Sequence, residues 1–161
     1  WGAQRVKGLS IKAVIEDIDG IIKLLEQVHD IHVDIRPDIF KRGYTKYGKD
    51  ELIEIIHDEN KPIYVAVDEK ILGYIFCVFK TNNNESLHPI KTLYIDDFCV
   101  LDEYRHKHIG TSLYEYIKEL AKTMGCYNIT LNVWEGNDDA LNFYKKLGLT
   151  TQKRFLEEIL I

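Results

Sequence analysis

The sequence is poor in cysteine and contains no long apolar run. Its three cysteines, Cys77, Cys99 and Cys126, are odd in number and lack the spacing of a metal site. We therefore expect reduced thiols, a cytoplasmic location and no bound metal. No stretch is apolar over the roughly 20 residues that a membrane-spanning helix needs, and the first residues lack a signal-like pattern. We expect no membrane partner.

An excess of positive charge is also missing. The formal net charge is −5, from 21 Lys and Arg against 26 Asp and Glu. Nucleic-acid partners favour basic proteins, so we expect none. Neither the G-x-x-x-x-G-K-[ST] pattern nor the G-x-G-x-x-G pattern of common nucleotide sites occurs. A small cationic molecule suits this charge balance slightly better than an anionic one.

The 161 residues and 45% hydrophobic content predict one domain with one core, over residues 1–161. Apolar periodicity and turn residues predict strands at 9–15, 63–67, 71–80, 91–100 and 127–133. They predict helices at 16–28, 50–57, 109–124 and 138–147, the second capped by Asp50 and the last by Asn137. Residues 149–161 read as one long strand or a tight pair of strands. The order β-α-α-β-β-β-α-β-α-β predicts an α/β (α+β) fold around one sheet.

The most informative segment is residues 93–111, LYIDDFCVLDEYRHKHIGT. A short apolar strand that contains Asp96 and Asp97 runs into an acidic turn. A basic loop, Arg105–Gly110, then leads into a strongly periodic helix. The first-turn amides of a helix have no intrahelical partners, and the helix dipole favours negative charge there. The segment therefore predicts a site for a phosphate-bearing ligand beside two carboxylates.

Two segments of the sequence resemble motifs of the GNAT superfamily of N-acetyltransferases. Residues Val100–Thr111, with Arg105 and Gly110, resemble its acetyl-CoA pyrophosphate loop, usually written Gln/Arg-x-x-Gly-x-Gly/Ala. Asn137, followed by ALNFYKKLGL, resembles a later helix that carries a tyrosine near the CoA sulfur. The strand LYIDDFCV is most similar to the polyamine and thialysine acetyltransferase branch. The resemblance implies a GNAT-like single domain with a twisted mixed, mostly antiparallel sheet flanked by helices.

The resemblance also implies a reaction, a co-substrate and partners. The reaction is direct transfer of an acetyl group from acetyl-CoA to a primary amine in a ternary complex. The preferred acceptor is a small cationic amine such as a polyamine, with an amino acid, an aminoglycoside or a protein amine as open alternatives, and homodimers are common in the superfamily. The implied acetyl-CoA contacts are Phe98, Cys99, Val100, Arg105, His106, Lys107, His108, Ile109, Gly110, Thr111 and Asn137. His108 stands where the motif usually has its first glycine, and it can still offer its N–H if its φ is negative.

Three residues carry the chemistry that the resemblance implies. Asp96 is the expected proton acceptor, Asp97 the expected substrate contact and Tyr144 the expected general acid. Adjacent acids in a regular strand face opposite sides of the sheet, so we expect different roles for the two. A phenol with a pKa of ~10 can protonate a departing thiolate. By periodicity alone, however, Tyr144 reads as a core residue on the stripe of Leu141 and Leu147.

The remaining candidates keep two interpretations each. The resemblance places Asp34, with Asp38, Tyr44 and Tyr47, in the segment where substrate enters, and a polar surface loop is the alternative. Trp134 either flanks the substrate or fills the core, and it is a candidate substrate contact. His29, His32 and Asp34 are spaced like metal ligands, but no further cluster completes a site, so we expect no metal. Cys99 opens a route through an acetyl-cysteine, which the absence of a neighbouring base disfavours.

Two other functions remain open from the sequence. One is a CoA-binding sensor or subunit of GNAT fold without catalysis, which the histidine at position 108 keeps open. The other is a phosphate-loop domain for a different nucleotide. CoA binding without turnover would indicate the first, and competition between CoA and ATP would test the second.

Overall fold

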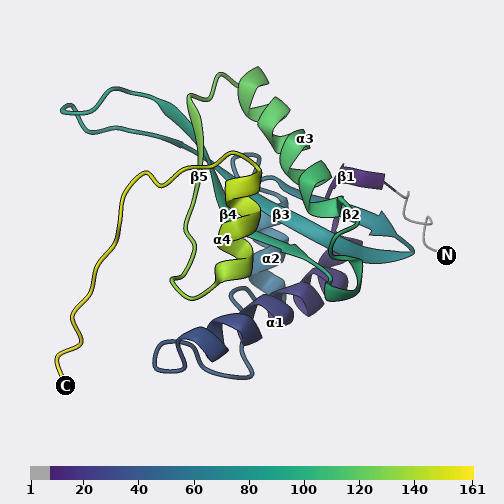
Figure 1. Cartoon of the computed structure of the whole chain (residues 1–161). Coiled ribbons are helices and arrows are strands. Elements are labelled where there is room, and N and C mark those ends of the chain that lie inside the picture. Colours follow the sequence, from purple (N-terminus) through teal and green to yellow (C-terminus); the bar gives the residue numbers. More distant parts are fainter. Residues whose placement is uncertain (1–7) are drawn as a thin grey trace.

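A computed structural model describes residues 8–161 of the chain (Figure 1). The strands are β1 (Gly8–Lys12), β2 (Ile63–Asp68), β3 (Lys70–Thr81), β4 (Lys91–Val100) and β5 (Asn128–Leu131). The helices are α1 (Ile18–Ile35), α2 (Lys49–Ile56), α3 (Ile109–Thr123) and α4 (Asp138–Lys146), with short 3₁₀ turns at Ile15–Asp17 and Asp102–Tyr104. The strand order is β1-β2-β3-β4-β5; the first four strands are antiparallel, and β5 runs parallel to β4. The predicted mixed, mostly antiparallel sheet is confirmed.

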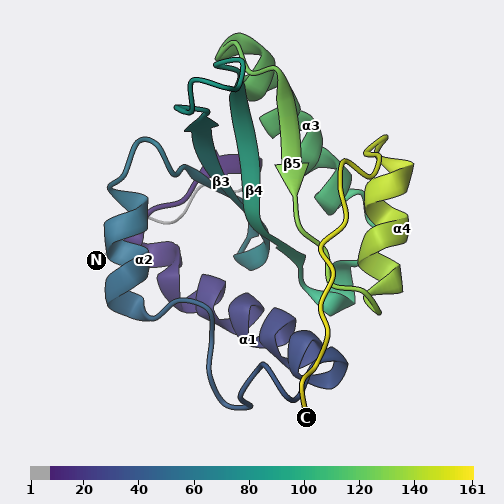
Figure 2. The same ribbon diagram turned by 90° about the vertical axis from the view of Figure 1, so that its left-hand side faces the viewer.

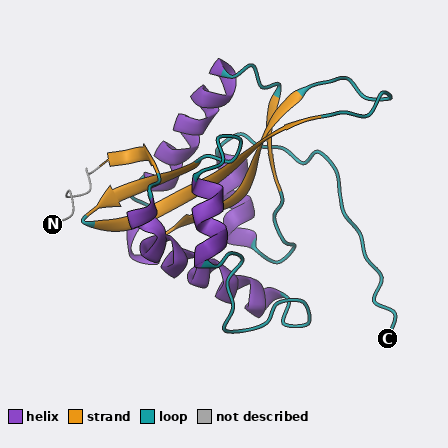
Figure 3. Ribbon diagram, turned by 180° about the vertical axis from the view of Figure 1, so that it is seen from behind, coloured by secondary structure: helices purple, strands orange, loops and turns teal. Residues whose placement is uncertain are grey.

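Helices cover both faces of this sheet, and Figures 1 and 3 show α1 and α3 on opposite sides of it. On one face, Leu24 and Leu25 of α1 join Tyr74 and Phe76 of β3 in a buried cluster. On the other face, the apolar stripe of α3 packs against the opposite side of β3 and β4 in a second cluster. α1 can lie close to the sheet because Gly20 has no side chain. A Cβ at this position would come within 2.5 Å of a side-chain atom of Ile71. None of the helices in residues 8–161 is long and apolar enough to cross a membrane.

Helix and strand boundaries differ clearly from the prediction at four places. β1, predicted at 9–15, ends at Lys12, and Ile15 begins a 3₁₀ turn. α1 continues to Ile35 because Ile31, Val33 and Ile35 extend its apolar pattern, and it ends before Pro37, which disfavours helical backbone in the residue ahead of it. α2 begins at Lys49 with Gly48 as its N-cap rather than at Asp50. β5 has only four residues, fewer than expected.

The prediction of a strand or strand pair at 149–161 is wrong for this structure. α4 is followed by Gly148, whose φ of 102° belongs to the left-handed region, and no regular element follows. Residues 150–161 instead extend away from the sheet, as Figures 1 and 3 show. A β-rich composition forms a strand only where a neighbouring backbone supplies hydrogen bonds, and the chain's own sheet does not supply them here.

Candidate functional site

A bulge in β4 brings Asp96 and Asp97 to the same face of the sheet. Phe76 of β3 pairs with Asp97 while Cys77 pairs with Ile95, so Asp96 is the extra residue. A bulge of this kind interrupts the alternation of side chains along a strand. Asp97 therefore faces the α1 side with its partner Phe76, and Asp96 is reached from that side by Tyr47. The expectation that the two acids face opposite sides is wrong.

Asp96 ties the loop between α1 and α2 to the sheet. The Tyr47 hydroxyl donates to its Oδ2 at 2.5 Å, and Lys46 Nζ lies 3.3 Å from its Oδ1. Lys46 also donates to the Asp96 carbonyl at 2.7 Å, while the Tyr47 ring stacks on Phe76. Burial, and then the Asp96 carboxylate, raises the pKa of Tyr47 above its ordinary range, so the phenol remains a donor. Both carboxylate oxygens of Asp96 thus have partners.

Asp97 lies deeper than Asp96, and its carboxylate group has fewer polar partners. Burial raises the pKa of its carboxyl group to about 6, against the opposing effects of Lys46 and of the Phe98 N–H. The Phe98 N–H donates to its Oδ1 at 2.9 Å. The neighbouring hydroxyl of Tyr74 is fully buried and has no hydrogen-bond partner in the described part of the chain. Asp97 is therefore a carboxyl group that changes charge close to neutral pH, beside a buried donor that a ligand or water can satisfy.

Tyr144 of α4 faces this acid across an aromatic cluster. Its ring centroid lies 6.2 Å from that of Phe98 and 5.7 Å from that of Phe143. Burial raises its pKa above the ordinary range, and the Asp97 carboxylate adds to the shift. The phenol consequently keeps its proton at neutral pH. The predicted cap of α4 is confirmed, since Asn137 Oδ1 accepts from the Ala140 N–H at 3.4 Å.

The start of α3 offers backbone amides to an anion. Its N-cap His108 makes no side-chain capping bond, and the amides of the first turn have no intrahelical partners. His106 and His108 have φ values of 64° and 63°, so the negative φ on which the offer of the His108 N–H was made conditional is not observed. The histidine instead adopts the left-handed backbone that a glycine takes readily. The basic side chains nearby include Arg105, which pairs with Asp102 at 3.0 Å.

Gly110 has a packing role in addition to any contact with a ligand. A Cβ at this position would come within 3.0 Å of Phe143 Cζ and 3.4 Å of Val100 Cγ2. The missing side chain lets the first turn of α3 approach both β4 and α4. Through Phe143, this glycine is linked to the aromatic cluster around Tyr144.

The C-terminal part of β4, after Ile95, is unpaired on the side of β5. β4 and β5 pair only from Thr92 to Ile95, opposite Asn128–Leu131, whereas β4 continues to Val100. Figure 2 shows the two strands side by side and then diverging. The Phe98 N–H in this stretch bonds to a carboxylate rather than to a strand. An extended ligand with amide groups can pair with this free edge.

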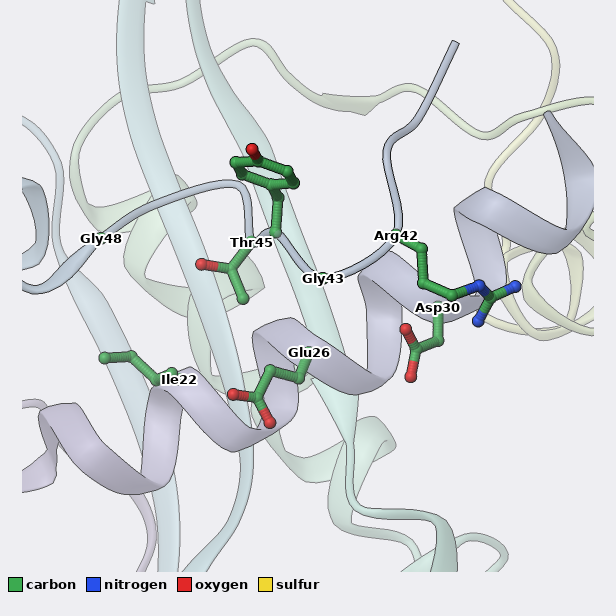
Figure 4. A pocket seen from close by; sticks show the side chains of 8 residues that line it. Ile22, Glu26, Asp30, Arg42, Gly43, Thr45 and Gly48 are labelled. Atoms are coloured by element: carbon green, nitrogen blue, oxygen red, sulfur yellow. The ribbon is translucent and has the colours of Figure 1, made fainter. Parts of the chain in front are cut away.

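Two pockets lie on either side of the loop between α1 and α2. One, of about 420 Å³, is lined by Asp96 together with Glu51 and Glu54 of α2 and by the rings of Tyr47 and Tyr94. The other, of about 670 Å³, lies between the loop and α1, where Asp30 lies beside Arg42 and Glu26 lies below Thr45 (Figure 4). Only the first pocket includes residues of β4, so it adjoins the acid pair.

The other predicted site residues lie farther along α1 and its following loop. Asp34 forms an exposed ion pair with Arg42 at 3.3 Å and lines neither of these pockets. Trp134 contacts Phe40 edge to face at 5.3 Å and is 37% exposed, so it joins the 132–137 loop to the α1–α2 loop instead of filling the core. His29 and His32 both pack against Phe40, and residues 8–161 contain no cluster of three or more metal-ligating side chains. Lys46 and Tyr74 were not predicted, because only the folded loop and sheet bring them to the acids.

The Cys99 thiol is held as a buried, protonated group. It donates to the Leu24 carbonyl at 3.7 Å and accepts from Gln27 Nε2 at 3.3 Å. Burial raises its pKa above the ordinary range. A nucleophilic cysteine needs the opposite shift, so the geometry disfavours an acetyl-cysteine route.

The comparison with family models agrees with this arrangement of β4, loop and α4. The model of the acetyltransferase (GNAT) family matches residues 25–149, which include both acids, the basic loop and Tyr144. The chain belongs to the acetyltransferase (GNAT) family. The enzyme class predicted from the two motifs, an N-acetyltransferase, is thereby confirmed.

Known GNAT proteins resemble the chain over different lengths. An uncharacterized N-acetyltransferase of Lactobacillus delbrueckii subsp. lactis is 30% identical over 98 residues, 61% of this chain and 54% of that protein. The chain thus spans about half the length of that relative. The thialysine N-epsilon-acetyltransferase of Bos taurus is 27% identical over 139 residues, 86% of this chain and 76% of the relative. A crystallised mutant protein of Bacillus halodurans matches with a TM-score of 0.91 and 30% identity, over 94% of this chain and 99% of its own.

These relatives confirm the GNAT fold without agreeing on an acceptor. Glucosamine 6-phosphate N-acetyltransferase 1 of Dictyostelium discoideum is 28% identical over 140 residues, 76% of this chain and 87% of that protein. Its name gives glucosamine 6-phosphate as the acceptor, whereas that of the bovine relative gives thialysine. The choice of acceptor therefore has to be argued from this chain's own pockets and charges.

Proposed function

We propose that this chain transfers an acetyl group from acetyl-CoA to a primary amine of a small cationic molecule, such as a diamine or polyamine. The observation that carries the proposal is the half-buried carboxyl group of Asp97, whose raised pKa of about 6 lies near neutral pH and which lies between Tyr144 and the pocket lined by Asp96. Perturbed titrating groups that converge beside a pocket are typical of catalytic sites.

The residues present fit acetyl-CoA in two places. The pyrophosphate would accept hydrogen bonds from the first-turn amides of α3, with Arg105 and Lys107 adding positive charge. The pantetheine amides would pair with the free edge of β4 at Phe98–Val100. Bound acetyl-CoA supplies a thioester carbonyl as the electrophile. The amide of Phe98 is then placed to donate to that carbonyl if it exchanges its bond to Asp97.

Asp97 is the better placed of the two acids to accept the proton of the amine. An alkylammonium ion has a pKa of ~10.4, so the acceptor arrives charged and must lose a proton before it attacks. Asp97 is ionised above pH 6, whereas both oxygens of Asp96 already bind the loop. In this assignment Asp96 positions Tyr47 and Lys46. The alternative, expected from the sequence, is that Asp96 accepts the proton. Kinetics of the Asp96 and Asp97 variants distinguish these two assignments.

Tyr144 would complete the proton balance at the leaving group. The C–N bond forms as the C–S bond breaks, and the electron pair of the C–S bond remains on sulfur. The protonated phenol of Tyr144 donates a hydrogen bond to the thiolate. Because its raised pKa makes full proton loss unfavourable, we expect charge stabilisation by this hydrogen bond. The attacking nitrogen loses a second proton to solvent as the amide forms, and the released thiolate takes up a proton from solvent, so the protons balance.

The pocket beside Asp96 suits an acceptor with a second positive charge. Glu51 and Glu54 lie on one side of it, and aromatic rings line the other. Carboxylates and ring faces both favour ammonium groups. Lys61 and Lys80 also line the pocket, which limits its net negative charge and favours acceptors with few cations over long polycations.

Thiol release from acetyl-CoA, measured with a chromogenic thiol reagent across spermidine, short diamines, thialysine, glucosamine 6-phosphate and an aminoglycoside, tests the proposal. We expect release that depends on the amine and is fastest for the diamine and polyamine group. Fastest release with glucosamine 6-phosphate would overturn the cationic acceptor while keeping the reaction. A thermal shift with CoA but no release with any amine would support a CoA-binding protein without catalysis.

A further inference from the structure

Gln27 of α1 makes hydrogen bonds at the end of β4, where the chain turns toward α3. Its Nε2 donates to the Val100 carbonyl at 3.0 Å, and its Oε1 accepts from the Asp102 N–H at 3.2 Å. Nε2 also donates to the Cys99 thiol at 3.3 Å. Figure 1 shows the end of β4 beside α1 at this point. One side chain therefore holds three residues of the segment that connects the sheet to the basic loop.

These contacts fix the orientation of the Gln27 amide. A backbone carbonyl can only accept and a backbone N–H can only donate, so the amide nitrogen must face Val100 and the oxygen must face Asp102. The two N–H groups of the nitrogen then serve Val100 and Cys99. A carboxylate lacks the donor, and an apolar side chain lacks both the donor and the acceptor, so neither can replace the glutamine.

Val100 marks the end of the free edge of β4. The Leu101 N–H donates to the Leu72 carbonyl of β3, and backbone groups alternate along an antiparallel strand, so those of Val100 point to the opposite edge. Gln27 occupies the Val100 carbonyl on that edge. A ligand that pairs with β4 can therefore use Phe98 and the Val100 N–H, and not the Val100 carbonyl.

Asp102 connects Gln27 to the basic loop. The Asp102 carbonyl accepts from the Arg105 N–H at 3.2 Å, and its Oδ1 pairs with the Arg105 guanidinium at 3.0 Å. The Tyr104 N–H donates to the Leu101 carbonyl at 2.8 Å and closes the short 3₁₀ turn. Arg105 and the first-turn amides of α3 are the groups that would bind a pyrophosphate. The position of this loop relative to β4 thus depends on the bond between Gln27 and Asp102.

We propose that Gln27 is a positioning residue of the acetyl-CoA site. It fixes the edge of β4, which would pair with the pantetheine arm, relative to the loop that would bind the pyrophosphate. This role rests on the proposed function, because it requires acetyl-CoA to lie along β4 and reach the start of α3. The hydrogen bonds of Gln27 go to the end of β4 rather than to Asp97 or Tyr144. Its loss should therefore weaken binding of the donor and leave the chemical step nearly unchanged.

The first test compares acetyl-CoA with S-acetylpantetheine, a donor that keeps the thioester and the pantetheine arm but has no phosphates. We expect Gln27→Met to raise the KM for acetyl-CoA about 10-fold, the effect of one or two lost hydrogen bonds, with kcat and the KM for the amine within about twofold of the wild type. With S-acetylpantetheine, kcat/KM should stay close to the wild-type value, because this donor does not reach the loop. An equal loss with both donors, or no change with either, would overturn the proposal.

Two control variants of α1 separate this role from a general effect on folding. Val28→Ala removes partly buried apolar atoms beside Gln27, so it should lower the midpoint of unfolding and keep the KM for acetyl-CoA. Lys23→Met places the same new side chain one turn earlier, at an exposed position, and should keep both values. A KM for acetyl-CoA that rises as much in Val28→Ala as in Gln27→Met would assign the effect to lost stability and overturn the positioning role.

The second test measures binding of CoA without turnover, by isothermal titration of the wild type and Gln27→Met. We expect a Kd about 10-fold higher for the variant, whether or not any amine is acetylated. If no amine causes thiol release but this difference in Kd remains, the proposed function is wrong and the role of Gln27 stands. If the wild type turns over and both proteins bind CoA equally, the proposed function stands and Gln27 has no positioning role. A wild type that binds no CoA would overturn both.

Discussion

At the scale of single residues, the two adjacent acids of β4 have different environments although they follow each other in sequence. The bulge places both on the α1 side, where loop residues bind Asp96 and burial raises the pKa of Asp97. We predict that kcat/KM increases with pH and levels off above an apparent pKa of about 6, which gives the pH profile an acid limb. Asp97→Asn should lower kcat by about 10²- to 10⁴-fold, the typical contribution of a general base, and remove this limb.

The matched variant Asp96→Asn should behave differently. It weakens the bonds to Tyr47 and Lys46, so we expect a higher KM for the amine with the acid limb retained. Steady-state kinetics from pH 5 to pH 9 with saturating acetyl-CoA separates the two cases. If Asp96→Asn removes the limb and Asp97→Asn keeps it, Asp96 is the proton acceptor, as the sequence indicated.

The same carboxyl group should lower the stability of the protein at neutral pH. The pKa of Asp97 is about 6 in the folded chain, above the ordinary 3.8, so ionisation costs folding free energy as the pH rises from 3.8 through 6. Two pKa units correspond to at most about 3 kcal/mol. We predict that Asp97→Asn is more stable than the wild type at pH 7–8 and similar to it near pH 4. Urea unfolding at both values measures this, with exposed Asp30→Asn as a control that should show no such difference.

His108 offers a test of backbone strain at the start of α3. Its φ of 63° costs a residue with a Cβ roughly 1 kcal/mol. We predict that His108→Gly stabilises the protein by about 0.5–1 kcal/mol, after the larger entropy of glycine in the unfolded chain is counted. Lys107→Gly, at a neighbouring position without a positive φ, should destabilise instead.

The affinity for CoA separates the two possible roles of this histidine. If the His108 backbone alone contacts the phosphates, His108→Gly keeps the thermal shift caused by CoA. A lost shift in a folded His108→Gly protein would instead assign a phosphate contact to the imidazole ring, and isothermal titration with CoA would measure its size.

At the scale of elements, the sequence predicts most helices and strands because their apolar patterns are local. β4 was expected at 91–100 and is observed there, and the hairpin of β2 and β3 has the expected partners. The bulge at Asp96 could not be predicted, because it depends on the register against β3 and not on the β4 sequence alone. For the same reason, the contacts of Lys46 and Tyr47 with Asp96 follow only from the folded loop.

The contact between α3 and α4 gives a prediction at this scale. Alanine normally stabilises a helix by about 1 kcal/mol relative to glycine. At Gly110, however, the added Cβ meets Phe143 at 3.0 Å, so we predict that Gly110→Ala destabilises by about 1–3 kcal/mol. The double variant Gly110→Ala, Phe143→Leu should recover part of this loss. Denaturant unfolding of the four proteins in this cycle measures the coupling, and a stabilising Gly110→Ala would contradict the close packing.

At the scale of the whole molecule, the residues after α4 show that the sequence alone does not identify the partner with which a segment pairs. Their composition favours a strand, yet a strand requires a partner, and in this structure residues 150–161 pair with no strand of the described chain. A pattern along the sequence predicts that a segment will pair, but it does not contain the identity of the chain that supplies the other edge. The proposed site has a similar limit, since both motifs are local while the pocket beside Asp96 is formed by α2, β3 and β4 together.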